Sequence, residues 1–122
     1  MLKFLLVGSA NTIFGLSVIF VAKKFFGLSD VFANLSGYAC GIILSFALNK
    51  RWTFKDRSGT YAALKRFLMV TAVAYISNIL LVLILIKNSI PDYVAHPVGA
   101  VPYIAICWVG YRFYAFQDTN LR

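Results

Sequence analysis

Residues 67–86 read F-L-M-V-T-A-V-A-Y-I-S-N-I-L-L-V-L-I-L-I, a run of twenty residues without a charged side chain. At a rise of about 1.5 Å per residue, a helix of this length crosses the roughly 30 Å hydrocarbon core of a bilayer. Three further apolar runs of similar length occupy residues 4–22, 31–48 and 94–116. The sequence therefore predicts an all-α membrane protein with four transmembrane helices.

The composition of the chain also indicates a membrane protein. Hydrophobic residues make up 61% of its 122 residues and charged residues only 13%, whereas a soluble domain is about 45–50% apolar and about 25% charged. A soluble protein of this size could not bury so much apolar surface. The length fits one domain, so we expect a single four-helix transmembrane domain over residues 1–122. Its first apolar run is too long for the h-region of a signal peptide, so we expect it to be retained.

Basic residues concentrate in one predicted loop and indicate an orientation. The loop of residues 49–66 holds six of them: Lys50, Arg51, Lys55, Arg57, Lys65 and Arg66. The opposite side has only Lys23, Lys24 and Lys87. Because cytoplasmic loops are enriched in Lys and Arg, we expect a multi-pass protein of the cytoplasmic membrane with both termini in the cytoplasm. The same bias explains the net charge of +8 without a nucleic-acid partner.

The second half of the chain resembles the first. When it is shifted by 62 residues, aspartate, glycine, basic and aromatic positions coincide: Asp30 with Asp92, Gly37 with Gly99, Lys50 with Arg112, Trp52 with Tyr114, Phe54 with Phe116 and Asp56 with Asp118. A shift of 63 places residues 3–4 on residues 66–67. We therefore predict two parallel repeats, about residues 1–56 and 64–118, each a helical hairpin with an acidic extracytoplasmic turn.

Several polar side chains fall within or at the ends of the predicted helices. A buried amide in lipid needs a hydrogen-bonding partner. One interpretation is that these side chains only join neighbouring helices; the other is that they line a path for a polar headgroup. The candidates for that path are Asn11, Thr12, Asn34, Asn49, Tyr75 and Asn78.

Small residues recur every four positions in the second predicted helix, at Ala33, Gly37, Gly41 and Ser45. Such a stripe lets another backbone approach closely. The approaching backbone could belong to the same chain or to a second copy in a homodimer, and the sequence leaves both open. The fourth helix has Tyr103 at the position that corresponds to Gly41, so the stripe is not repeated in full.

The chain lacks the residue patterns of several other function classes. No Asp or Glu lies in the core of any apolar run, and proton-coupled exporters normally need an ionisable group there. We find no phosphate-binding loop and no nucleophile–base–acid set, and Cys40 and Cys107 have no ligand spacing. We therefore expect no enzymatic activity, no cofactor and no metal site.

Two segments carry a resemblance to a known family. F-L-L-V-G-S-A-N-T at residues 4–12 and S-F-A-L-N-K-R-W-T-F at residues 45–54 are similar to segments of the GtrA-like family of small polytopic membrane proteins. The spacing from residues 65–67 to Phe116 also fits this family, so the resemblance covers nearly the whole chain. G-Y-R-F at residues 110–113 departs from it, because an Asn-containing turn is expected there.

The resemblance implies a role in cell-surface polysaccharide synthesis or glycosylation. It implies that the protein moves a polyprenyl-phosphate-linked sugar across the cytoplasmic membrane and that a partner glycosyltransferase uses the sugar outside. An alternative is a membrane anchor that recruits the glycosyltransferase and transports nothing. A second alternative, an exporter of small solutes, is opposed by the absence of a membrane-embedded acid.

The cargo would be an anionic lipid, and basic side chains at the cytoplasmic interface would attract its phosphate. The candidates for this role are Lys50, Arg51, Arg112 and Arg66. Trp52 and Phe54 are expected to stack on the sugar or on the first isoprene unit. Membrane lipids surround the chain in any of these interpretations.

Overall fold

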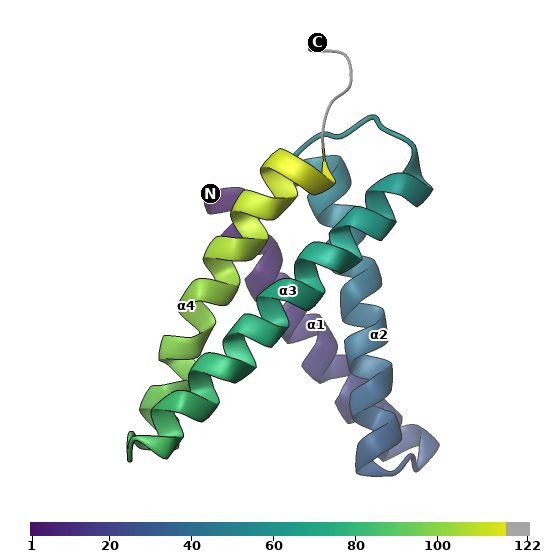
Figure 1. Ribbon diagram of the computed structural model, residues 1–122. Helices are drawn as coiled ribbons and strands as arrows, with labels where there is room; N and C mark the ends of the chain where they lie inside the picture. Colours follow the sequence, from purple (N-terminus) through teal and green to yellow (C-terminus); the bar gives the residue numbers. More distant parts are fainter. Residues whose placement is uncertain (117–122) are drawn as a thin grey trace. The chain divides into compact units, whose positions relative to one another are not determined.

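The computed structural model describes residues 1–116, and within them the chain forms four long α-helices and no strand (Figure 1). Helix α1 spans Leu2–Phe26, α2 spans Asp30–Leu48, α3 spans Thr60–Lys87 and α4 spans Asp92–Gly110. In this part of the chain, these four helices are long and apolar enough to cross a membrane. The prediction of an all-α protein with four transmembrane helices is confirmed.

The outward surfaces of the helices are apolar. Large hydrophobic side chains are exposed along all four of them, among them Ile13, Ile43, Leu83 and Val101. Such a surface would drive a soluble protein to aggregate, whereas in a bilayer it is the surface that faces lipid. The chain is a multi-pass membrane protein.

The helices form two compact units, Met1–Lys55 and Asp56–Arg122, here called the first and the second unit. In the first unit α1 packs against α2. The Lys3 ammonium near the start of α1 lies 5.6 Å from the ring centroid of Trp52, which follows the end of α2. The two helices therefore run antiparallel. In the second unit α3 packs against α4. Gly99 lies against Val82 and Gly110 against Val70, so these helices also run antiparallel.

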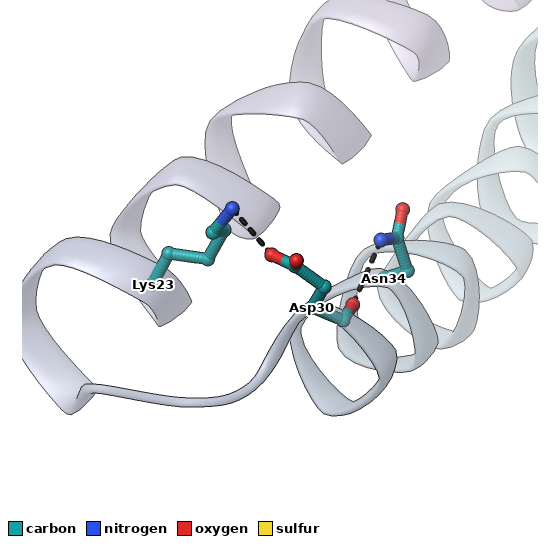
Figure 2. A network of polar contacts seen from close by, with 3 residues as sticks. All are labelled: Lys23, Asp30 and Asn34. Atoms are coloured by element: carbon teal, nitrogen blue, oxygen red, sulfur yellow. Dashed lines mark hydrogen bonds and ion pairs between the residues drawn. The ribbon is translucent and has the colours of Figure 1, made fainter.

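A three-residue turn joins the helices of the first unit. Gly27 ends α1 with φ 63° and donates its backbone N–H to the carbonyl of Ala22; glycine adopts this left-handed conformation without steric cost. Figure 2 shows the far side of the turn, where the ammonium of Lys23 pairs with the carboxylate of Asp30 at 2.5 Å. The side-chain amide of Asn34 donates to the Asp30 carbonyl at 2.8 Å.

Each second helix of a pair ends in a π-helical turn, η1 at Asn49–Thr53 after α2 and η2 at Tyr111–Ala115 after α4. In each turn the backbone N–H of the next residue, Phe54 or Phe116, donates to the carbonyl five positions earlier at 2.9 Å. Such turns are rare and occur frequently at functional sites, because the extra residue per turn changes the direction of the side chains.

Glycines set the distance between the helices of each pair. A Cβ atom on Gly37 would lie 2.5 Å from Cγ1 of Ile19, and one on Gly99 would lie 2.5 Å from Cγ2 of Val82. A larger residue at either glycine would therefore require Ile19 or Val82 to shift, or the paired helices to move apart. Asp118, which the predicted repeat pairs with Asp56, lies outside the described residues.

Candidate functional site

A cluster of basic and aromatic side chains lies at the end of the first unit where η1 begins. Lys50 and Arg51 are neighbours in η1, yet Lys50 is only 9% exposed and Arg51 is exposed. Trp52 is 44% exposed, and Phe54 is half-buried. The cluster thus combines one buried cation and one exposed cation with an accessible indole ring.

The sequence-based prediction missed Lys3 as a member of this cluster. Its ammonium lies over the Trp52 ring at a distance suited to a cation–π interaction. The shift of 63 residues aligns Lys3 with Arg66, which was a candidate, and that alignment was the signal that could have identified it.

Two predicted arginines lie at the corresponding end of the second unit. Arg112 is exposed in η2, with its guanidinium carbon 5.2 Å from the ring centroid of Trp108 and 5.4 Å from that of Phe113. Arg66 lies one residue before Phe67, whose ring stacks on that of Tyr111 in η2. The Nε atom of Arg66 is buried and has no hydrogen-bond partner among the described residues.

Four of the predicted headgroup-path residues make contacts within their own helix or unit. The Thr12 hydroxyl donates to the Gly8 carbonyl of its own helix at 3.1 Å, and Asn34 likewise bonds within α2. Tyr75 is exposed on α3. Asn78 lies against α4, where its Nδ2 atom would be 3.0 Å from a Cβ atom on Gly99.

Asn11 of α1 lies against α2, and Asn49 is the buried first residue of η1. The Asn11 amide fills the space beside Gly41, where a Cβ atom would lie 3.3 Å from its Oδ1. Asn49 is 1% exposed and donates from Nδ2 to the hydroxyl of Ser45 at 3.2 Å. Neither Oδ1 atom has a hydrogen-bond partner among the described residues. Two buried acceptors of the first unit are therefore unsatisfied, and a missing hydrogen bond at a buried atom is costly.

The same region of the second unit is filled by aromatic rings. Tyr111 is 3% exposed; its ring centroid lies 4.7 Å from that of Phe67 and 5.8 Å from that of Phe116. Its hydroxyl lies 2.6 Å from that of Thr71. This cluster was not predicted, although Tyr111 belongs to the segment that departs from the family pattern.

The predicted packing stripe lies on α2, and two of its residues, Gly37 and Gly41, face α1. Ala33, Gly37 and Gly41 are buried, and Ser45 is half-buried.

Within residues 1–116, no three His, Cys, Asp or Glu side chains are grouped so that they could hold a metal ion.

The chain was compared with known protein families and with curated proteins. A family model described as GtrA/DPMS, transmembrane domain, matches residues 3–116. No curated protein matches the chain.

Proposed function

The chain belongs to the GtrA/DPMS transmembrane-domain family, and from this premise we propose that it moves a polyprenyl-phosphate-linked sugar across the cytoplasmic membrane. The family suggests a part in handling such lipids. The observation that carries the step to translocation is the basic and aromatic cluster at one end of a multi-pass helix pair, because a lipid phosphate needs cations and a sugar ring stacks on an indole.

In this proposal the end of the first unit that carries Lys3, Lys50 and Arg51 faces the cytoplasm. That orientation follows the bias of Lys and Arg toward cytoplasmic loops, and it places both termini inside. Each basic side chain near an anionic leaflet contributes about 1 kcal/mol of attraction. The cluster would therefore collect the cargo on the side where the sugar is loaded.

We also propose that the two units are copies of one helical hairpin within a single four-helix domain. Two structural observations support this. The turns η1 and η2 begin 62 residues apart, at Asn49 and Tyr111, which is the shift that aligns the sequences. Gly37 and Gly99, also related by this shift, make the same close approach to the preceding helix.

The proposed transport is downhill and not enzymatic. An uphill carrier would need a coupled ion, and no Asp or Glu lies in the core of the apolar runs to bind one. Synthesis of the lipid inside and its consumption by a glycosyltransferase outside would supply the gradient.

Reconstitution in liposomes tests the translocase. Transbilayer movement of a fluorescent short-chain polyprenyl-phosphate sugar would be followed for the wild type, Arg51→Ala and protein-free vesicles. The matched control is Arg57→Ala, which removes an exposed arginine from the following loop. We expect the wild type and Arg57→Ala to accelerate movement, and Arg51→Ala to lower that rate about fivefold, since it loses one cation worth about 1 kcal/mol.

Equal rates in wild-type and empty vesicles, over a panel of sugars, would refute translocation. The alternative function, a membrane anchor that recruits a glycosyltransferase, would then account for the family membership. In that case Arg51→Ala would weaken the association with the enzyme and leave lipid movement unchanged.

A further inference from the structure

We propose that the sugar is recognised by the first unit alone, where the side-chain amides of Asn11 and Asn49 accept hydrogen bonds from its hydroxyl groups. The second unit, in which tyrosines occupy the matching region, is a structural counterpart that binds no sugar. This inference rests on the proposed function and names the atoms that bind the sugar headgroup.

The unsatisfied Oδ1 atoms are the starting point. Asn49 is almost completely buried, and only its Nδ2 atom is bonded, to Ser45. Asn11 is half-buried beside Gly41, and its Oδ1 is likewise without a partner among the described residues. Because a buried acceptor without a hydrogen bond destabilises the fold, two such atoms in the first unit indicate that a ligand supplies the missing donors.

The chemistry of the two atoms selects the ligand group. An amide oxygen only accepts hydrogen bonds, so its partner must donate. The oxygens of a phosphodiester are acceptors and cannot fulfil this role, whereas every free hydroxyl of a sugar can. The amides therefore suit the sugar, while the cations that follow Asn49 in η1, Lys50 and Arg51, suit the phosphate.

Small residues lie close to Asn11. A Cβ atom added to Gly8, one turn before Asn11 in α1, would meet no atom within 4 Å. Gly41 in α2 has no side chain of its own, and the Asn11 amide uses that space. Both Oδ1 atoms are covered in this structure, so a sugar hydroxyl reaches them only when the groups that cover them move aside.

The second unit has large residues at the matching positions. The shift of 62 residues aligns Asn49 with Tyr111 and Gly41 with Tyr103, and the shift of 63 aligns Asn11 with Ala74. Ala74 is fully buried and offers no polar side-chain atom. The ring of Tyr111 packs against Phe67 and Phe116, and its hydroxyl forms a hydrogen bond with that of Thr71. The two unsatisfied amide acceptors of the first unit have no counterpart at these positions.

Lipid binding by the full chain in nanodiscs tests the inference with two kinds of probe. One is a short-chain polyprenyl phosphate, and the other is the same lipid carrying glucose, mannose or galactose. Native mass spectrometry would compare the wild type, Asn11→Ala and Asn49→Ala. The matched control is Asn88→Ala, which removes an exposed amide at the end of α3.

We expect Asn11→Ala and Asn49→Ala each to lose about tenfold in affinity for the preferred sugar lipid and to bind the sugar-free lipid as the wild type does. Asn88→Ala should match the wild type with both probes. Asn49→Tyr, which introduces the residue found at this register in the second unit, should lose the preference for the sugar lipid altogether. Circular dichroism and size-exclusion chromatography would show that each variant is folded.

Different failures have different meanings. If the wild type binds the sugar lipid but folded Asn11→Ala and Asn49→Ala bind it equally well, the inference is wrong and the proposed function stands. The inference is also wrong if these variants lose affinity for both probes alike, or if the wild type does not prefer any sugar lipid. If the wild type binds neither probe, the proposed function fails and the inference falls with it.

Discussion

Tyr111 shows how one side chain holds the second helix pair together. Its ring stacks on Phe67, and its hydroxyl forms a hydrogen bond with the hydroxyl of Thr71. The Thr71 hydroxyl in turn donates to the backbone carbonyl of Phe67. Within the membrane there is no water to replace a lost partner. The tyrosine therefore contributes both apolar contact and a hydrogen bond that would be missed if it were removed.

We predict that Tyr111→Phe lowers the free energy of unfolding by about 1 kcal/mol, the typical net value of one hydrogen bond. Tyr111→Ala should cost about 3–5 kcal/mol, because it also leaves a cavity beside Phe67. Unfolding in detergent, followed by circular dichroism, measures both. Since the bond joins Tyr111 to Thr71, Tyr111→Phe should cost much less in a Thr71→Val background, and full additivity would contradict this account.

Asn49 shows where residue-level prediction from the sequence is limited. Its place among polar candidates followed from its type and its position at the end of an apolar run. Its bond to Ser45, four residues earlier, is local, whereas its burial depends on tertiary packing, which one sequence does not contain. Thr12 and Asn34 have the same polar character and also bond four residues back, yet both are exposed, and the spacing of residues does not distinguish a buried amide from an exposed side chain.

At the scale of the elements, close glycine contacts define the seam of each pair. Gly37 and Gly99 permit approaches that a Cβ atom would forbid. In lipid this contact matters more than in water, because no hydrophobic force drives helices together and packing must supply the attraction.

We predict that Gly99→Ala and Gly37→Ala each destabilise their pair by about 1–3 kcal/mol, the range for overpacking a well-filled site. The control is Gly59→Ala at the start of α3, where a Cβ atom would meet nothing within 4 Å. Thermal or denaturant unfolding in detergent would compare the stabilities of the three variants. A Gly99→Ala variant as stable as Gly59→Ala would mean that Val82 moves aside and that the seam is not close-packed.

The turn of the first unit should be far less sensitive to substitution. The side chains of Lys23 and Asp30 are 51% and 78% exposed, and exposed ion pairs contribute little to stability. We expect a double-mutant cycle of Lys23→Ala and Asp30→Ala to give a small coupling energy that disappears in high salt. A large coupling energy that does not depend on salt would show that the pair is shielded from water.

The helices themselves were predictable because each apolar residue adds to the hydrophobicity that identifies a membrane span. Twenty uncharged residues indicate a span whatever surrounds them, and all four apolar runs lie within or close to the observed helices. The ends were less predictable: α1 and α3 begin before their apolar runs, since a helix continues through polar residues while its backbone bonds are satisfied. The π-helical turns had no sequence signal, because they depend on which carbonyl the Phe54 and Phe116 N–H groups reach.

At the scale of the whole molecule, the proposed function requires one orientation in the membrane. The cargo is loaded in the cytoplasm, so the end that carries Lys50 and Arg51 must face inward. The α2–α3 connection should then be cytoplasmic and the α1–α2 turn extracytoplasmic, as the distribution of basic residues predicts.

Single cysteines test this orientation in intact cells. Cys40 and Cys107 would first be replaced by alanine, and Gly59→Cys and Ser29→Cys then introduce one exposed thiol in each connection. We expect a membrane-impermeant maleimide to label Ser29→Cys in intact cells, and Gly59→Cys only after the membrane is permeabilised. The reverse pattern would place the basic cluster outside, where a cation site could release cargo but could not load it, so inward-to-outward translocation by this cluster would be ruled out.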